Sequence, residues 1–271
     1  MDLSQVSRTA ILTLITRVVA SEKENAVFND PMAGLCLERL VPLASVREKN
    51  WIIGRKRFYA GISLHDAKAG ARRSKVFDAA ADRFIAANPR CTVVNLGCGL
   101  DTRFWRISNQ NCRYIEIDLP EVVALKTQIL QDQLSYELIG CSVLDASWMD
   151  QVSKDGNSRF LFLAEGLLMF LPGSQVVRLF QQLAQRFIRS QFVFDMVPRK
   201  YLSGIWKLLL RLETSLNWRL DASWVFGIND PVEIESYGPG LRLLGVEKGS
   251  AGPVITLSIN AASTSGTDQS R

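Results

Sequence analysis

Hydrophobic residues recur every three or four positions along the first third of the chain, from residue 4 to residue 84. This spacing places apolar side chains on one face of a helix and predicts a helical N-terminal region. Examples are Ile11, Leu14, Ile15, Val18 and Val19. A last amphipathic helix is expected over residues 74–87, because Asn88-Pro89 is a typical helix end.

From Cys91 onward, short apolar runs alternate with helical patterns. Strands are predicted at residues 92–96, 113–117, 136–139, 160–164 and 192–195. Helices are predicted from about residue 102, over 120–131 and over 173–189. Strands that alternate with helices indicate right-handed crossovers and a parallel sheet covered on both faces. The predicted fold class is therefore α/β.

The segment from Arg199 to Asp230 breaks this alternation and is rich in aromatic residues on apparently helical stretches. These are Tyr201, Trp206, Trp218, Trp224 and Phe226. The runs 241–246 and 254–259 after it resemble a closing β pair. We expect a helical cap over residues 1–87, a core over 88–262 with an insertion at about 199–235, and a flexible tail over 263–271.

Composition narrows the class of protein. The chain has 271 residues, 47% hydrophobic and 22% charged, which is enough to bury a full core. Its five cysteines lack the spacing of a zinc site or a redox dithiol, so we expect a cytoplasmic protein without a metal. No apolar run reaches the roughly 20 residues that span a bilayer, and no signal peptide is evident. A membrane partner is not expected.

The net charge of +5 is modest but uneven, because basic residues gather between residues 47 and 75. This region either steers an anionic ligand or is a solvated helix face. No nucleic-acid-binding motif accompanies it, so a nucleic-acid partner is not expected.

A glycine turn, Gly97-Cys98-Gly99, follows the predicted strand at 92–96. Glycines at this place allow the backbone to approach a ligand, since no Cβ intervenes. In a dinucleotide-binding fold a third glycine would make room for a pyrophosphate, but here Thr102 stands at that position. A nicotinamide cofactor, and with it an oxidoreductase, is therefore disfavoured.

The next predicted strand ends in Asp118, whose carboxylate can accept both hydroxyls of a ribose. Glycine turn and strand-end acid together indicate a nucleoside-containing cofactor. Asp101, just after the turn, has two interpretations: a ligand contact, or a cap for the following helix.

Five co-ordered phrases resemble the leucine carboxyl methyltransferase family, in particular its bacterial branch that methylates polyketide carboxylates. The phrases are RSKVFD (73–78), VNLGCGLDTR (94–103), EIDLPEV (116–122), AEGLLMFLP (164–172) and FD (194–195). The resemblance covers about residues 10–260. It implies a Rossmann-like class I methyltransferase with a mostly parallel seven-stranded sheet, an N-terminal helical cap and a helical insertion before the last strands.

The resemblance also implies a cofactor, S-adenosylmethionine, which leaves as S-adenosylhomocysteine. In that case Arg73 pairs with the methionine carboxylate, because a guanidinium fits a carboxylate bidentately. Gly97 and Gly99 lie beside the methionyl part, Asp118 holds the ribose, and Glu165 contacts the cofactor near its amino group or sulfonium. An alternative for Glu165 is stabilisation of a helix N-terminus. Arg17 is the nearest equivalent of a further basic residue in some relatives.

Two departures from the family pattern concern cofactor contacts. In GCSVLD (140–145), Ser142 stands where the family usually has an aspartate at the adenine. We expect Ser142 and Val143 to contact the cofactor, with Asp145 as a compensating acid. Phe170 replaces a frequent tyrosine, which removes a hydroxyl that can reach the cofactor carboxylate.

Methyl transfer from a sulfonium needs alignment of nucleophile, methyl and sulfur more than it needs acid–base chemistry. A carboxylic acid is already ionised at neutral pH, whereas a phenol benefits from a base. The single histidine, His65, is expected to be an ordinary surface residue, so no catalytic base is assigned. We therefore expect methylation of the carboxylate of a small acidic or aromatic molecule such as a polyketide. The alternatives are a phenol or hydroxyl acceptor, and a non-catalytic protein that binds S-adenosylmethionine.

Overall fold

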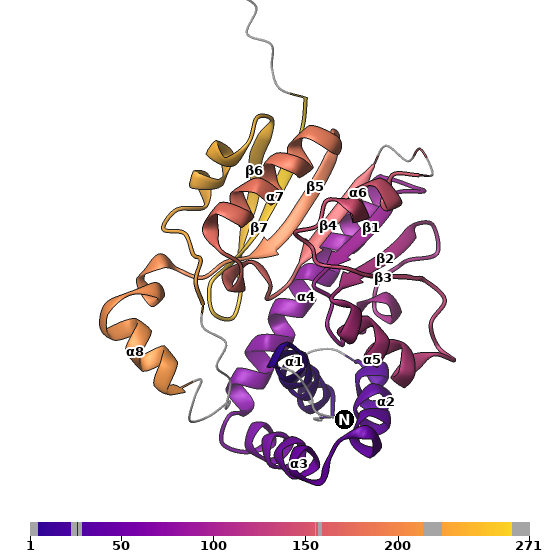
Figure 1. Cartoon of the computed structure of the whole chain (residues 1–271), viewed down its shortest axis with the longest axis vertical. Coiled ribbons are helices and arrows are strands. Elements are labelled where there is room, and N and C mark those ends of the chain that lie inside the picture. The colour runs from indigo at the N-terminus through magenta and orange to yellow at the C-terminus, as the bar shows by residue number, and fades with distance from the viewer. Residues whose placement is uncertain are drawn as a thin grey trace, which may run out of the picture.

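The structure, a computed structural model, describes residues 5–22, 26, 29–154, 156, 159–213 and 224–261. Figure 1 shows one twisted sheet with a group of helices at one end. The helices are α1 (Gln5–Ser21), α2 (Pro31–Leu40), α3 (Val46–Ala60), α4 (Leu64–Ala87), α5 (Pro120–Leu130), α6 (Ser147–Val152), α7 (Gly173–Arg186) and α8 (Gly204–Glu213). The strands are β1 (Thr92–Leu96), β2 (Arg113–Asp118), β3 (Glu137–Gly140), β4 (Phe160–Ala164), β5 (Ser190–Asp195), β6 (Leu241–Lys248) and β7 (Pro253–Ile259).

The seven strands form one sheet in the order β3-β2-β1-β4-β5-β7-β6. Strands β1 to β5 are parallel, and β7 pairs antiparallel with both β5 and β6. This confirms the predicted α/β class, the mostly parallel sheet and the closing β pair. The strand order reverses between β1 and β4, and in open α/β sheets such a switch point is where ligands bind.

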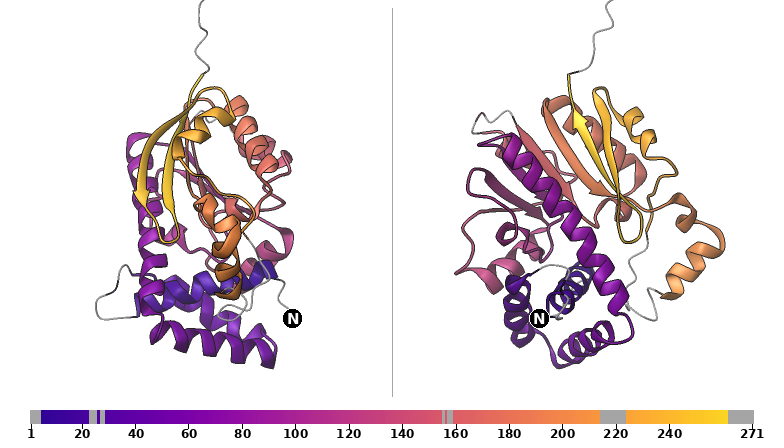
Figure 2. Two further views of the ribbon diagram at one scale, coloured as in Figure 1. Left: turned by 90° about the vertical axis from the view of Figure 1, so that its left-hand side faces the viewer. Right: turned by 180° about the vertical axis from the view of Figure 1, so that it is seen from behind.

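Helices cover both faces of the sheet. On one face α6 and α7 pack on β1, β4 and β5 through residues such as Trp148 and Phe180. On the other face the second half of α4 packs through Phe77, Ala81 and Phe84. The views from the front and from behind show these two layers (Figure 2). Such burial on both faces explains why β1 and β4 read as continuous apolar runs.

The helices α1, α2 and α3, with the start of α4, form the predicted cap. Their apolar faces make a separate core that also takes in Leu125 and Ile129 of α5. Local signals set the helix ends: Asp30 accepts from the Ala33 N–H ahead of Pro31, and Ser45 and Glu48 form a capping box. Helix α4 belongs to both the cap and the core, because its first part packs in the cap and its second half packs on the sheet. A domain boundary at residue 87 would therefore separate α4 from the sheet that it covers.

Two element predictions were wrong in detail. The helix expected from residue 74 begins at Leu64, because the small, buried residues Ala67 and Ala71 extend its packing face over two further turns. The helix expected from about residue 102 is only a 3-10 turn, Arg103–Trp105, whose first side chain points into a buried ion network. In the insertion, Tyr201 lies in a 3-10 turn (Arg199–Leu202) and Trp206 in α8, whereas Trp224 and Phe226 lie in non-helical chain. Trp218 and the tail 263–271 fall outside the described residues.

Among the described helices, none is both long and apolar enough to cross a membrane. Within the same residues, no group of three or more His, Cys, Asp or Glu side chains is arranged to hold a metal ion.

Candidate active site

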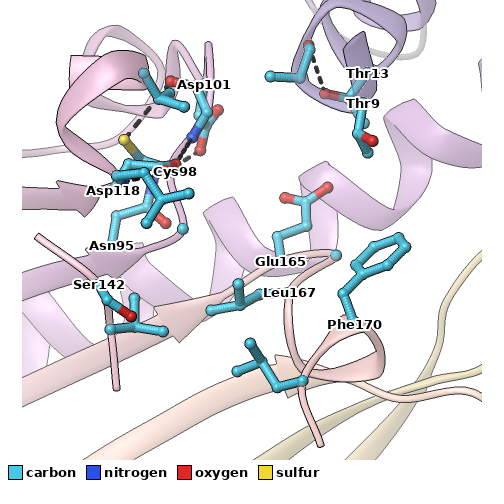
Figure 3. Close-up of a pocket in the computed structure, with 18 of the residues that line it drawn as sticks. Thr9, Thr13, Asn95, Cys98, Asp101, Asp118, Ser142, Glu165, Leu167 and Phe170 are labelled. Atoms are coloured by element: carbon cyan, nitrogen blue, oxygen red, sulfur yellow. Dashed lines mark hydrogen bonds between the residues drawn. The ribbon is translucent and has the colours of Figure 1, made fainter. Parts of the chain in front are cut away.

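A cavity of about 410 Å³ opens at the carboxyl ends of β1, β2 and β4, beneath α1. This is the end of the sheet at the switch point, where the strand order predicts a ligand. All seven cofactor-binding residues proposed from the sequence line it: Arg73, Gly97, Gly99, Asp118, Ser142, Val143 and Glu165. Figure 3 shows several of the lining side chains converging from the sheet and from α1. Segments more than ninety residues apart are thus brought to one place.

The glycine turn forms the floor of this cavity. Gly97 and Gly99 adopt positive φ angles of 63° and 52°, which side chains with a Cβ rarely adopt. A Cβ at Gly97 would come 2.8 Å from Leu167 Cδ1, and one at Gly99 would come 3.0 Å from Ala10 Cβ. The turn therefore requires glycine at both positions. It presents bare backbone to the cavity between the sheet and α1.

Asp118 ends β2 beside this turn. Its Oδ2 accepts the Gly99 N–H at 2.6 Å, and its Oδ1 accepts the Leu119 N–H at 2.7 Å. Burial raises the pKa of this carboxyl, although the two N–H groups oppose the shift. Each oxygen has one of its two lone pairs engaged, so the carboxylate can still accept hydrogen bonds from a ligand in the cavity.

Arg73 projects from α4 between the carboxyl ends of β4 and β5. Its Nε donates to Glu165 Oε1 at 3.0 Å, and its Nη1 donates to Asp195 Oδ2 at 3.0 Å. Among the described residues no partner is recorded for Nη2, which lies 3.5 Å from the place of a Cβ on Gly166. Two carboxylates thus fix the guanidinium, and one of its nitrogens stays available to a ligand.

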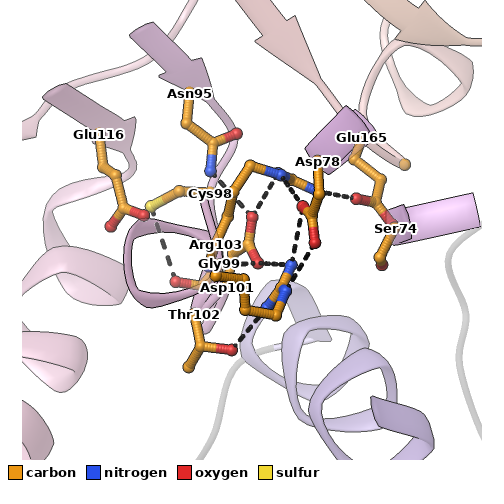
Figure 4. Close-up of polar contacts among 12 residues, drawn as sticks. Ser74, Asp78, Asn95, Cys98, Gly99, Asp101, Thr102, Arg103, Glu116 and Glu165 are labelled. Carbon is orange, nitrogen blue, oxygen red and sulfur yellow. Dashed lines mark hydrogen bonds and ion pairs between the residues drawn. The ribbon is translucent and has the colours of Figure 1, made fainter. Parts of the chain in front are cut away.

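Behind the cavity wall lies a buried ion network centred on Arg103, whose side chain is fully buried. Its three nitrogens donate to Asp78 at 2.7 Å, to Asp101 and to Glu165. Asp78 belongs to α4, Asp101 to the glycine turn and Glu165 to the end of β4, so one side chain joins three elements (Figure 4). Burial opposes ionisation of Glu165, but Arg73 and Arg103 outweigh it and lower its pKa.

Asp101 has the capping role considered from the sequence, and its ligand contact stays a prediction. Its Oδ1 accepts the Arg103 N–H at 3.1 Å, as a cap of the short 3-10 turn does. It also lines the cavity and pairs with Arg103 and Arg106. Burial acts to raise its pKa, but these guanidinium groups lower it strongly.

A second part of the network joins the cap to the glycine turn. Asp30, ahead of α2, accepts from Thr102 Oγ1 at 2.6 Å and from Arg106 Nη1 at 2.7 Å. Arg17 of α1 donates to the Leu100 carbonyl at 2.6 Å and lines the cavity, and its buried Nε lies 3.7 Å from Asp30. Charged and polar contacts therefore add to the apolar packing of Ala10 and Leu100 in holding α1 and α2 against the turn.

The lining contains carboxylates but no histidine among its described residues. Those carboxylates, Asp101, Asp118 and Glu165, already accept from arginine or backbone N–H donors. His65 lies outside the cavity with its side chain 86% exposed. Each of the described lining carboxylates is thus already engaged by at least one donor, and none of the described lining residues is a histidine.

The two departures from the family pattern both lie at the cavity. Ser142 Oγ accepts the Leu144 N–H at 3.2 Å, and Val143 is fixed because Trp148 donates to its carbonyl at 3.0 Å. Asp145 does not line the cavity; it accepts the Ser147 N–H at 2.9 Å at the start of α6. Phe170 forms part of the wall with Leu167 and Leu171.

Sequence reasoning named Arg17 of α1 but missed three other residues of that helix. Thr9, Ala10 and Thr13 line the cavity opposite Glu165 and Phe170 (Figure 3). No local signal marks them, because they lie on an ordinary apolar helix whose position depends on the cap. Asp78, Arg106 and Asp195 were likewise not foreseen as supports of the site, since their partners are distant in sequence.

Comparison with known proteins agrees with this geometry. Residues 10–184 match the model of the leucine carboxyl methyltransferase family. Tetracenomycin polyketide synthesis O-methyltransferase TcmP of Streptomyces glaucescens is 27% identical over 241 residues, which are 89% of this chain and 82% of that protein. The S-adenosyl-L-methionine-dependent methyltransferase dpfgK of Gibberella zeae is 24% identical over 89% of this chain and 81% of its own length.

Among solved structures, a SAM-dependent methyltransferase from Anabaena variabilis superposes with a TM-score of 0.52 at 14% identity. The match covers 70% of this chain and 85% of that one. At this identity the likeness shows the fold alone.

Proposed function

This chain belongs to the leucine carboxyl methyltransferase family and is an S-adenosylmethionine-dependent methyltransferase; from that premise we propose that it methylates a carboxylate of a small organic acid. The observation that carries the proposal is that the cavity wall offers no unengaged carboxylate and no histidine among its described residues. Its carboxylates are engaged by arginines and backbone N–H groups, and none of its described residues is a histidine. An acceptor that is already ionised needs no base from the wall.

We assign the cofactor contacts residue by residue. Arg73 offers Nη2 to the methionine carboxylate, and Arg17 adds positive charge on the same side. Gly97 and Gly99 give the backbone approach for the methionyl part, and Asp118 accepts from the ribose hydroxyls. Ser142 and Val143 border the adenine. Glu165 places negative charge close to the cofactor's cationic groups and holds Arg73 in position.

The fit of this cofactor rests on the shape of the glycine turn. Both glycines are excluded from having a side chain by contacts of 2.8 Å and 3.0 Å, so the cavity floor stays bare where a ligand needs to approach. A cavity of about 410 Å³ is within the range of cofactor sites. When bound, the cofactor supplies an electrophilic methyl group on a positively charged sulfur.

An acceptor carboxylate held in line with that methyl group would take it as the carbon–sulfur bond breaks, and sulfur would keep the electron pair. No proton is transferred, and a neutral methyl ester results. The protein's residues therefore contribute orientation and exclusion of water, which supply most of the rate for such a displacement. Arg73 and Glu165 are positioning residues in this scheme.

We extend the proposal to secondary metabolism and to the cytoplasm. The name of one relative supports the first, because it refers to tetracenomycin polyketide synthesis. The five cysteines, all free, are compatible with a reducing compartment.

The test uses purified protein, methyl-labelled S-adenosylmethionine, and a panel of aromatic and aliphatic acids beside phenols of the same ring size. Label should enter products that mild base releases, as methyl esters do. Base-stable methyl ethers from the phenols would overturn the carboxylate acceptor. Calorimetric binding of the cofactor without turnover on any acceptor would instead favour a non-catalytic binding protein.

A further inference from the structure

The chain between β5 and β6 leaves the sheet beside the cavity and returns beside it. Its two ends pair with each other, since the Arg199 N–H donates to the Ile228 carbonyl at 3.0 Å. On the return, the Val225 N–H donates to the Met169 carbonyl at 2.8 Å. Met169 directly precedes Phe170, which lines the cavity. The segment is thus fixed to the cavity wall at the position of Trp224 and Val225.

Three aromatic side chains of this segment meet at that place, and we call them the aromatic rim: Tyr201, Trp206 and Trp224. The Tyr201 ring centroid lies 6.0 Å from that of Trp206 at 89°, and 6.2 Å from that of Trp224 at 69°. These edge-to-face geometries are those of stable aromatic contacts. The rim therefore has defined positions, although α8, which carries Trp206, stands away from the sheet (Figure 1).

Exposure distinguishes the rim from the aromatic core. Trp148 in the core is 0% exposed, whereas Trp206 is 49% exposed. Its neighbours Ile205 and Leu208 are 67% and 57% exposed. Apolar surface gathered on one helix beside a cavity is typical of a recognition site rather than of packing.

A cation accompanies the rim. Lys200 Nζ lies 5.2 Å from the Tyr201 ring centroid and 5.6 Å from that of Trp206. Cation–π contacts at such distances hold the ammonium group at the rings. The surface beside the cavity therefore combines stacking area with one positive charge.

We propose that the aromatic rim and Lys200 bind the distal part of the methyl acceptor, a planar polycyclic aromatic acid with a second anionic group. Its reacting carboxylate enters the cavity past Phe170, its fused rings lie on Tyr201, Trp206 and Trp224, and the second anionic group meets Lys200. This inference rests on the proposed carboxylate methylation and adds the acceptor class to it. An aliphatic acid lacks the ring faces that the rim offers.

The test compares variants of the full-length protein in the presence of S-adenosylhomocysteine. Calorimetry measures binding of anthracene-2-carboxylate, naphthalene-2,6-dicarboxylate, 2-naphthoate and octanoate. Because aromatic stacking on a protein ring contributes about tenfold or more to binding, Trp206→Ala should weaken the anthracene acid by about tenfold and leave octanoate within about twofold. Lys200→Met should weaken the naphthalene dicarboxylate by about threefold more than 2-naphthoate. Lys207→Ala, an exposed lysine on the same helix, is the matched control and should change neither.

Equal affinity of wild type and Trp206→Ala for the anthracene acid would overturn the proposed role of the aromatic rim. So would a loss of octanoate affinity in Trp206→Ala as large as the loss for the anthracene acid. Methyl esters formed on the anthracene acid at wild-type rates by Trp206→Ala would also overturn it, while leaving the proposed function intact. A different result would separate the two proposals. If aromatic acids bind in a way that depends on Trp206 but only hydroxyl groups are methylated, the aromatic rim is supported as a binding site and the proposed carboxylate methylation is wrong. Tyr201→Leu gives a second rim variant should Trp206→Ala fold poorly.

Discussion

On the glycine-turn side of the cavity, charged side chains are buried and paired, whereas on the aromatic rim large apolar side chains lie in contact with solvent. Arg103 and Asp101 belong to the first region, and Trp206 and Ile205 to the second. The first region joins α4 to the end of β4 through the ion pairs of Arg103, and α1 to the glycine turn through a hydrogen bond from Arg17 to the Leu100 carbonyl. The segment that carries the second region is fixed to the cavity wall because the Val225 N–H donates to the Met169 carbonyl. The two ends of this segment are hydrogen-bonded to each other, from the Arg199 N–H to the Ile228 carbonyl.

The difference fits the roles that we propose for the two sides, cofactor binding and acceptor binding. A cofactor with fixed charges is held by groups that are already oriented, because reorienting them on binding would cost affinity. An apolar acceptor gains affinity from the surface area that it covers, and that area has to be exposed beforehand. A family can therefore change its acceptor by altering the insertion without disturbing the cofactor side.

The largest effect is expected from removing the centre of the ion network. Arg103→Met leaves Asp78, Asp101 and Glu165 without a shared cation in a buried place, so the free energy of unfolding should fall by about 3–5 kcal/mol. Urea denaturation followed by circular dichroism measures it. Arg83→Ala, which removes an exposed arginine of α4 paired with Glu247 of β6, should change stability little. Equal losses of unfolding free energy in the two variants would mean that the ion network does not stabilise the glycine-turn side of the cavity.

The next effect concerns cofactor binding alone. Arg73→Ala should weaken S-adenosylmethionine by about 10- to 100-fold, since hydrogen bonds to a charged group contribute about 1.5–3 kcal/mol and Glu165 and Asp195 would then face the cofactor carboxylate with less compensation. Calorimetry gives the affinity. The neighbouring exposed Arg72→Ala is the control. Arg106→Ala would be an unsuitable control, because Arg106 is buried against Asp30, Asp78 and Asp101. An unchanged affinity for Arg73→Ala would remove the assigned carboxylate contact.

The ion network should also give the protein an acid-sensitive stability. The pKa of Asp101 is lower in the folded chain than in the unfolded chain, so its ionisation stabilises the fold above the unfolded value near 4. That contribution is lost as the pH falls through the folded pKa. The difference in unfolding free energy between wild type and Asp101→Asn should therefore be constant above about pH 5 and shrink progressively as the pH falls below about 4.

Asp195 gives the opposite case, because burial raises its pKa in the folded chain despite Arg73. Its ionisation costs stability, and that cost appears as the pH rises above the unfolded value. Asp195→Asn should remove this cost, so the two variants should differ from wild type with opposite pH slopes. Parallel slopes would contradict the assigned shifts.

Most of the sheet was predictable because its signals are local. Buried runs such as 92–96 and 160–164 read directly as strands, and Asn88-Pro89 marks the end of α4. The chemistry of the cofactor side was predictable for the same reason: glycines with positive φ and a strand-end acid stand at fixed places in the sequence.

The supports of the site were not predictable from local pattern. Arg103 looks like the start of a helix, but its partners Asp78 and Glu165 lie 25 and 62 positions away. Thr9 and Thr13 reach the cavity only because the cap places α1 above the glycine turn. Such contacts depend on how separate elements dock, which no spacing within one element encodes.

The smallest effect should come from the boundary between the two regions. Phe170 lines the cavity next to Leu171, and Phe170→Tyr adds one hydroxyl at the place where the family resemblance implies a contact with the cofactor carboxylate. A neutral hydrogen bond is worth about 0.5–1.5 kcal/mol, so cofactor affinity should rise by about threefold, measured by calorimetry. Phe170→Leu, which removes the ring without adding a hydroxyl, should show no such gain. If Phe170→Tyr instead changes the KM of the acid acceptor and leaves cofactor affinity unaltered, Phe170 belongs to the acceptor side together with the aromatic rim. The boundary between the cofactor side and the acceptor side would then lie deeper in the cavity, nearer Leu167.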